Sequence, residues 1–196
     1  MLAGGARYPD AVVALFMDEM GYYRWPAPAV DWMPAAPHPS LIAPCADNNK
    51  QWRTIGVLNA LSGQVNYLDN YIVGRQYVIK MYHLVEQLYP DASRIYVVQD
   101  NWSIHSHPDV LEALSALPRI EPVWLPTYAP WLNPIEKLWR WLRQAVLKMH
   151  RLAADWDELH CRTQAFLDQF TGGSQELLRY VGLLGDGQLA QALRVP

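Results

Sequence analysis

Residues 11–18 read Ala-Val-Val-Ala-Leu-Phe-Met-Asp, and this stretch decides the fold class. The apolar run is far too short to span a bilayer, and its Val, Leu and Phe content is typical of a buried strand. We predict a strand over residues 11–17 that ends at Asp18-Glu19. A second apolar strand, over residues 94–99, also ends at an acid, Asp100. Because an open α/β sheet places its ligand site beyond the carboxyl ends of its strands, the sequence predicts a site at these aspartates.

The segments around these two strands predict a sheet of mixed direction. Residues 52–61 and 64–70 are β-leaning runs joined by Ser62-Gly63, which is a hairpin signal. Helices and strands alternate after them, which favours an α/β fold whose five-stranded mixed sheet is flanked by helices. A proline-rich segment over residues 25–44 is predicted to be an irregular loop. The remaining predicted elements are helices over residues 74–89, 108–117, 133–149 and 155–170 and a strand over residues 121–125.

Composition and charge limit the class of protein. The 196 residues are 51% hydrophobic and 18% charged, which indicates one globular domain and excludes a disordered chain. Cys45 and Cys161 have no metal-ligand spacing and form no disulfide framework, and residues 1–10 have no secretion-signal pattern, so we expect a reducing cytoplasm. The net charge of -3 is unusual for a protein that holds DNA, because neutralising phosphates supplies much of DNA affinity.

Three acids are candidates for catalysis, although each has a structural interpretation on its own. Asp18 and Asp100 are predicted where turn and capping residues are common. Glu136 can complete a capping box with Asn133 and can pair with Arg140, four residues later. Parallel strands that end at one edge would bring Asp18 and Asp100 together, and the helix from Asn133 would add Glu136. Three converging carboxylates repel one another unless a cation is present, and hard divalent ions prefer oxygen ligands.

The same acids lie in motifs that resemble the catalytic domain of mariner-like and related bacterial insertion-sequence transposases, which are DDE-type enzymes. The most specific motif is residues 125–136, Leu-Pro-Thr-Tyr-Ala-Pro-Trp-Leu-Asn-Pro-Ile-Glu. The others are residues 98–105, Val-Gln-Asp-Asn-Trp-Ser-Ile-His, and residues 16–19, Phe-Met-Asp-Glu. Between Asp100 and Glu136 lie 35 residues (136 − 100 − 1), close to the family's spacing. The resemblance covers roughly residues 12–170.

The resemblance implies an RNase H-like fold and a catalytic triad of Asp18, Asp100 and Glu136. It implies two Mg²⁺ or Mn²⁺ ions, with Asp18 bridging them and each of the other acids completing one site. The implied reaction is cleavage of DNA at transposon ends, followed by attack of the freed 3′-hydroxyl on target DNA without a covalent protein–DNA intermediate. We therefore assign residues 1–171 to a DDE catalytic domain and residues 172–196 to a C-terminal tail.

DNA contacts are expected from the helix that contains Glu136. Arg140 and Arg143 follow at i+4 and i+7 on the same face, which suits guanidinium–phosphate pairing along a DNA backbone. The alternative is a solvated face with an internal ion pair between Glu136 and Arg140.

Other residues beside the motif acids have a weaker case for contact with DNA. His105, five residues after Asp100, is a candidate for contact with the scissile phosphate, and the alternative is a hydrogen-bonded loop residue. Most of the nine tryptophans are expected to pack in the core. Trp131 and Trp102 stand next to motif acids and are the candidates for stacking on bases.

The resemblance also carries expectations about partners. Family members have an N-terminal helix-turn-helix region that recognises the transposon ends, whereas the first strand here is predicted to begin almost at residue 11. We expect a catalytic half, which is a second reading frame of a split element, a truncated copy or a domesticated remnant. Its expected partners are transposon ends and target DNA, on which it forms a homodimer, and a separate helix-turn-helix polypeptide is a candidate partner. We expect the chain in the bacterial cytoplasm at the nucleoid, without membrane contact. The alternatives are an inactive or domesticated remnant that binds DNA as a scaffold, and an RNase H-like nuclease without strand transfer.

Overall fold

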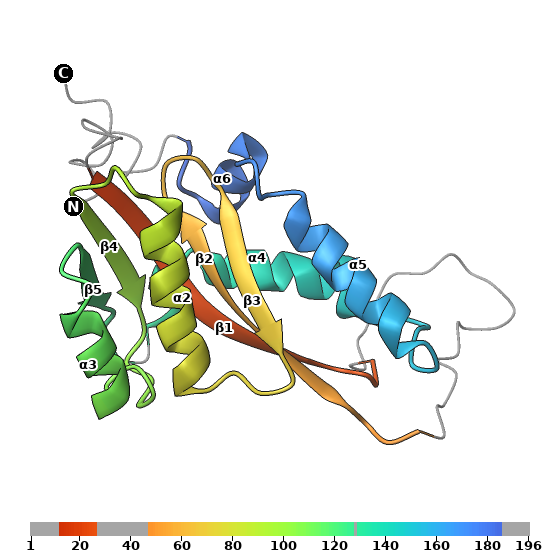
Figure 1. The fold of residues 1–196 in the computed structure, drawn as a ribbon. Coiled ribbons are helices and arrows are strands. Elements are labelled where there is room, and N and C mark those ends of the chain that lie inside the picture. Colours follow the sequence, from red (N-terminus) through yellow and green to blue (C-terminus); the bar gives the residue numbers. More distant parts are fainter. Residues whose placement is uncertain (1–11, 27–46, 128, 186–196) are drawn as a thin grey trace, which may run out of the picture.

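The predicted mixed sheet is present in a computed structural model of the chain, which describes residues 12–26, 47–127 and 129–185 (Figure 1). Most of the proline-rich segment predicted as a loop lies outside these residues. The five strands have the spatial order β3-β2-β1-β4-β5. Their bounds are β1 Val12–Tyr23, β2 Gln51–Asn59, β3 Val65–Asn70, β4 Arg94–Gln99 and β5 Ile120–Trp124.

Strand β1 is central, and its two edges are paired over different lengths. Its parallel pairing with β4 runs from Val12↔Arg94 to Phe16↔Val98, whereas its antiparallel pairing with β2 continues to Tyr23↔Gln51. The prediction that this strand ends at residue 17 is therefore wrong, because β2 keeps the second half of β1 extended. Asp18 lies inside β1, just past the point where its neighbour β4 stops pairing.

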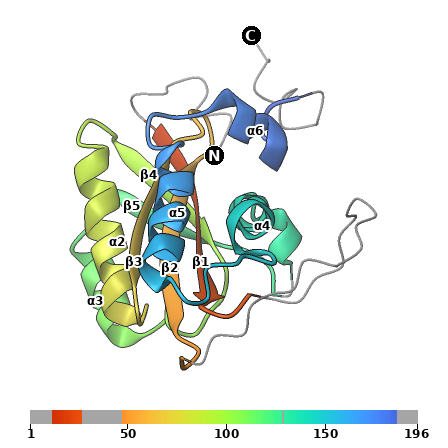
Figure 2. The same cartoon turned by 90° about the vertical axis from the view of Figure 1, so that its right-hand side faces the viewer.

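Helices cover both faces of the sheet. The first face carries α2 and α3, and the second carries α4, with α5 and α6 packed on the same side (Figure 2). Among the described residues no helix is both long enough and apolar enough to pass through a membrane. The helix bounds are α2 Arg75–Leu88, α3 Pro108–Ser115, α4 Ile135–Leu142, α5 Trp156–Asp168 and α6 Gln175–Val181.

The alternation of side chains along β1 assigns each residue to one of these faces. Val13 and Met17 pack in the cluster under α2 and α3, whereas Phe16 and Met20 pack in the cluster under α4, α5 and α6. Asp18 has the same parity as Phe16 and Met20. Its side chain therefore belongs to the face that α4 covers.

Helix α4 differs from the single helix predicted over residues 133–149. It is α-helical only over Ile135–Leu142 and continues as a π-helical segment, Arg143–Leu147. The backbone then leaves the helix at Lys148, and Met149 adopts a positive φ of 49°. The wider π turn changes the angular spacing of side chains, so residues before and after Leu142 do not follow one helical phase.

The segment predicted as a C-terminal tail contains a packed helix. In α6, Leu177, Leu178 and Val181 are buried in the same cluster as α4 and α5. The Nζ of Lys137 on α4 donates to the backbone oxygen of Val181 at 2.8 Å. The packed part of the chain thus continues past the predicted boundary at residue 171 at least to Leu183.

Gly56 on β2 leaves room for the largest side chain of the buried core. A Cβ at this position would lie 2.8 Å from Cη2 of Trp139, a fully buried residue of α4. The absence of a side chain at Gly56 therefore lets α4 lie close against the sheet at the strand pair Asp18↔Gly56.

We predict that Gly56→Ala destabilises the fold by about 1–3 kcal/mol, because the added methyl group forces Trp139 or the β2 backbone to move. Urea unfolding measures the change. Gly172→Ala is the matched control, since a Cβ there meets nothing within 4 Å, and it should change stability by no more than about 0.5 kcal/mol. Equal stability of the two variants would show that Trp139 does not rest on Gly56.

Candidate active site

Two aspartates occupy equivalent positions on neighbouring parallel strands. The last pair of β1 and β4 is Phe16↔Val98, and Asp18 and Asp100 each follow that pair by two residues. Both side chains line one cleft of about 340 Å³, and Glu136 from the first turn of α4 lines it as well. The three acids that the sequence singled out are therefore brought to one cleft, at the carboxyl ends of the parallel strands.

The beginning of α4 is tied to the backbone beside Asp18. The Nδ2 of Asn133 donates to the backbone oxygen of Met17 at 3.0 Å, and Asn133 is only 3% exposed. The residue that flanks the helix start is Pro134, and no side chain caps α4. The alternative of a capping box between Asn133 and Glu136 is therefore not what the described residues show: the Nδ2 of Asn133 anchors α4 to β1, and its Oδ1 has no hydrogen-bond partner among them.

Trp139 connects the second turn of α4 to Asp18. Its indole Nε1 donates to Oδ2 of Asp18 at 3.0 Å, and its ring crosses the sheet over Gly56. The sequence predicts most tryptophans to pack in the core, and Trp139 is fully buried. Nothing in the sequence indicates its hydrogen bond, since the partner Asp18 belongs to another part of the chain.

Asp100 is held by the turn that follows β4. The backbone N–H of Trp102 donates to Oδ1 of Asp100 at 3.0 Å, and the Nδ2 of Asn101 donates to the backbone oxygen of Leu125 at 2.7 Å. The side chain of Asp100 is 54% exposed, whereas Asp18 is partly buried. Asp18 therefore lies deeper in the cleft than Asp100.

The electrostatics of the cleft strongly disfavour a negative charge on Asp18. Burial, together with the negative charges of Glu136 and Glu19, raises the pKa of Asp18 from 3.8 to about 8. A hydrogen bond from the backbone N–H of Glu19 opposes this shift, and the charge of Asp100 adds to it. The cleft is therefore a place where a cation would be stabilised and where, without one, Asp18 keeps its proton near neutral pH.

His105 lies beneath the aspartates and is only 1% exposed. Its Nε2 lies 3.5 Å from Oε1 of Glu19 and 3.6 Å from Oδ1 of Asp100. The Oε1 of Glu19 and the Nδ1 of His105 are buried without a hydrogen-bond partner in the described part of the chain. This burial counts against the direct contact with DNA predicted for His105, because no phosphate can reach the ring without a rearrangement.

The two arginines predicted to contact DNA are both exposed. Arg140 lies one turn after Glu136 on α4, and Arg143 begins the π-helical segment. Within residues 12–26, 47–127 and 129–185, neither guanidinium group has a carboxylate close enough for an ion pair. The alternative interpretation of Arg140 as the partner of Glu136 is therefore not what the described residues show.

The acids of the cleft do not form a closed metal-binding cluster by themselves. In the described ranges, no three His, Cys, Asp or Glu side chains are placed closely enough to hold one ion together. An Mg²⁺ ion usually takes only one or two carboxylates and completes its shell with water and phosphate oxygens. The donor set of the cleft fits that pattern, in which substrate completes the site.

Comparison with known proteins places this chain in a family. The model of the family described as DDE superfamily endonuclease matches residues 13–160. The insertion element IS630 uncharacterized 39 kDa protein of Shigella sonnei is 23% identical over 167 residues, which cover 84% of this chain. The chain spans about half of that curated relative, 48% of its length.

Solved structures with a similar fold include complexes of the Mos1 transposase. The Mos1 paired-end complex with the left transposon end has a TM-score of 0.63 at 18% identity and covers 98% of this chain and 56% of the Mos1 chain. The Mos1 mariner paired-end complex with Mn has a TM-score of 0.61 at 18% identity and covers 92% and 53%. The Mos1 catalytic domain alone has a TM-score of 0.56 at 16% identity and covers 98% and 84%. These likenesses confirm the RNase H-like fold.

The raised pKa of Asp18 predicts how stability depends on pH in the absence of divalent metal. Between the ordinary pKa of 3.8 and the folded value of about 8, the folded protein binds more protons than the unfolded chain. The contribution of Asp18 to the free energy of unfolding is therefore fully present below about pH 4 and is lost as pH rises through about 8. Urea unfolding across this range should show the loss, and Asp18→Asn, which can still accept the bond from Trp139, should remove most of it. At pH 8 the free energy of unfolding of Asp18→Asn should exceed that of the wild-type protein by an amount on the order of 2–4 kcal/mol.

An unchanged slope of stability against pH in Asp18→Asn would contradict this assignment. It would mean that another group in the cleft takes up the proton.

Proposed function

The chain belongs to the DDE superfamily endonuclease family, and from that premise we propose that it is the catalytic domain of a DDE transposase. It cleaves DNA at the ends of a mobile element and joins the freed 3′-hydroxyl to target DNA. The observation that carries this proposal is the meeting of Asp18, Asp100 and Glu136 in one cleft, from two parallel strands and one helix start. Phosphoryl transfer requires mainly positioned charges, and this arrangement supplies acids held on rigid elements.

We propose that the cleft binds two divalent ions, Mg²⁺ or Mn²⁺, through the three carboxylates. The support is the placement of three carboxylates in one cleft, together with the pKa of Asp18, which burial and then the negative charges of Glu136 and Glu19 raise to about 8. Asp18 would contact both ions, and Asp100 and Glu136 would each hold one. When bound, such a pair of ions activates the attacking oxygen and stabilises the leaving oxygen in phosphoryl transfer.

The role of the surrounding protein is to hold the acids in position. Trp139 donates to Asp18, and the backbone of Trp102 donates to Asp100, so each aspartate has one oxygen fixed by a hydrogen bond. Asn133 holds the start of α4 on β1 and thereby sets the height of Glu136 over the cleft. We assign His105 a positioning role under Asp100 in place of a contact with DNA, since its ring lies between two carboxylates.

We propose that Arg140 and Arg143 contact the DNA backbone along α4, beyond Glu136. Their support is exposure and the lack of a described carboxylate partner. The net charge of -3 means that phosphate contacts are few and local. We also propose that a separate helix-turn-helix polypeptide recognises the transposon ends and that a homodimer supplies the two active sites that two ends require. Such an enzyme would work in the bacterial cytoplasm, at the nucleoid.

The alternative is a remnant that keeps the fold and binds DNA as a scaffold. It is favoured by the acidic net charge and by the spacing of the acids, since no three His, Cys, Asp or Glu side chains of the described residues lie close enough to hold one ion. An RNase H-like nuclease without strand transfer is the third candidate. The first prediction below separates the enzyme from the remnant, and joining of a pre-cut DNA end separates the transposase from the nuclease.

We predict that the wild-type protein nicks supercoiled DNA in the presence of Mn²⁺. Asp18→Asn, Asp100→Asn and Glu136→Gln should each lower the rate at least about 10²-fold, because each removes charge from the site where the transition state is stabilised. Agarose gels with time courses measure the rate. Glu112→Gln, which removes an exposed acid of α3 outside the cleft, is the control and should nick like wild type. Folded wild-type protein that does not nick would favour the remnant.

For the arginines, we predict that Arg140→Ala and Arg143→Ala each weaken DNA binding for all sequences alike. Each change should also lower the slope of log Kd against log salt concentration by about 1, since each removes one phosphate contact. Fluorescence anisotropy with labelled duplex at several salt concentrations measures both quantities. Arg162→Ala removes the same charge from α5, where Arg162 pairs with Glu158. If all three variants have the same slope, the arginines of α4 are not in the DNA path.

A further inference from the structure

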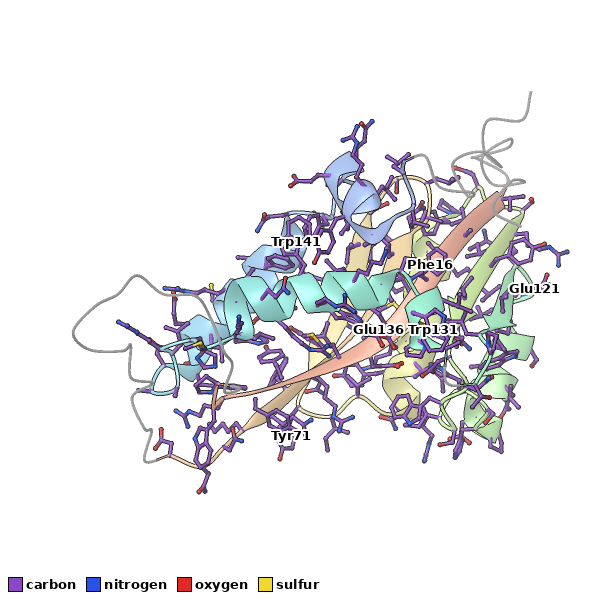
Figure 3. All side chains as sticks on the ribbon, turned by 180° about the vertical axis from the view of Figure 1, so that it is seen from behind. Phe16, Tyr71, Glu121, Trp131, Glu136 and Trp141 are labelled. Carbon is purple, nitrogen blue, oxygen red and sulfur yellow. The ribbon has the colours of Figure 1, made fainter. Side chains whose placement is uncertain are left out.

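A tryptophan stands exposed at the rim of the candidate active site. Trp131 is 75% exposed, and Leu132 beside it is 48% exposed. Both belong to the 3₁₀ turn η1, Pro130–Leu132, and Pro130 itself lines the cleft with the three acids. Figure 3 shows Trp131 and Glu136 at the same end of α4. An indole in water at this place leaves a large apolar face without a partner.

The backbone fixes this exposed position. The N–H of Leu132 donates to the oxygen of Ala129 at 3.0 Å, and the N–H of Asn133 donates to the oxygen of Pro130 at 2.9 Å. The side chain of Asn133 is bound in turn to Met17 on β1. The turn that carries Trp131 is thus held at both ends and anchored to the central strand. The indole is presented outward by rigid structure and is not the consequence of a loosely placed loop.

The depth of the cleft indicates what meets this indole. A phosphate that approaches Asp18 must pass Asp100, which lies farther out and is 54% exposed. A strand whose phosphate enters the cleft brings its bases to the rim, where an unpaired base leaves one face without a stacking partner. An aromatic ring at the rim can cover that face, and it does so for any base because every base has a π-face.

We propose that Trp131 stacks on a nucleobase displaced from the duplex next to the phosphate held in the cleft. The inference rests on the proposed function, since it takes DNA as the occupant of the cleft. The exposed Arg140 and Arg143 support DNA as that occupant, because they lie in the last turn of α4 and just after it, with the charge that phosphates require. Trp131 is then a binding residue that aligns the strand, and the acids act on the phosphate.

The test uses a short duplex with a single 2-aminopurine, which fluoresces brightly when unstacked. In one probe the analogue is paired with thymine, and in the other it faces an abasic site. Binding is measured in Ca²⁺ for the full chain and for Trp131→Ala, Trp131→Phe and Trp25→Ala. Trp25 is the matched control, a tryptophan that is 49% exposed and lies outside the cleft lining.

We expect wild type and Trp25→Ala to quench the unpaired probe and to bind it with equal Kd. Trp131→Ala should lose the quenching and weaken that Kd about tenfold, whereas Trp131→Phe should retain most of both, because a phenyl ring also stacks. The paired probe should distinguish the variants much less. Absence of quenching by wild type, or equal Kd values for Trp131→Ala and Trp25→Ala, would overturn the inference.

A separate measurement keeps this result apart from the proposed function. Nicking of supercoiled DNA by the wild-type protein in Mn²⁺ tests the enzyme, whereas the fluorescence assay needs no turnover. If wild type nicks but Trp131→Ala binds the unpaired probe like wild type, only the stacking role fails. If wild type does not nick, the proposed function fails, and the quenching still decides whether Trp131 holds a base.

Discussion

The hydrogen bond between Trp139 and Asp18 is the contact on which the geometry of the cleft depends. It joins α4 to the central strand at 3.0 Å, and it is possible only because Gly56 leaves the sheet bare under the indole ring. With Asn133 bound to Met17, it fixes the height and rotation of α4. Glu136 lies between these two anchors in the sequence, so its position follows from them.

This contact also explains why an acidic group can remain partly buried at the centre of the fold. Burial, and then the negative charges of Glu136, Glu19 and Asp100, raise the pKa of Asp18 to about 8. The indole N–H can bond either protonation state of the carboxyl, so Asp18 keeps its orientation whether or not a cation is present. Ionising Asp18 lowers the free energy of unfolding. The apolar packing of α4, α5 and α6 on the same face of the sheet offsets this loss.

The sequence predicts the sheet and the acids well because both depend on local patterns. Apolar strands that end in aspartate, in a chain that alternates helices and strands, restrict Asp18 and Asp100 to one edge. The continuation of β1 to Tyr23 was missed because it depends on pairing with β2. The anchoring roles of Asn133 and Trp139 were missed for a similar reason. Patterns within a helix describe that helix alone, whereas the hydrogen-bond partners of these two side chains, Met17 and Asp18, lie on β1.

The net charge of -3 and the proposed action on DNA are compatible if affinity is concentrated in a few groups. A nearly balanced surface with a net charge of -3 attracts phosphates little, so strong non-specific affinity for DNA is not expected of it. What remains is α4 with its two flanks, where Trp131 offers an apolar face before the helix and Arg140 and Arg143 offer charge in its last turn and just after it. Stacking is insensitive to the sign of the surrounding charge. A site that combines it with two guanidinium groups can therefore hold a distorted strand in a protein that is acidic overall.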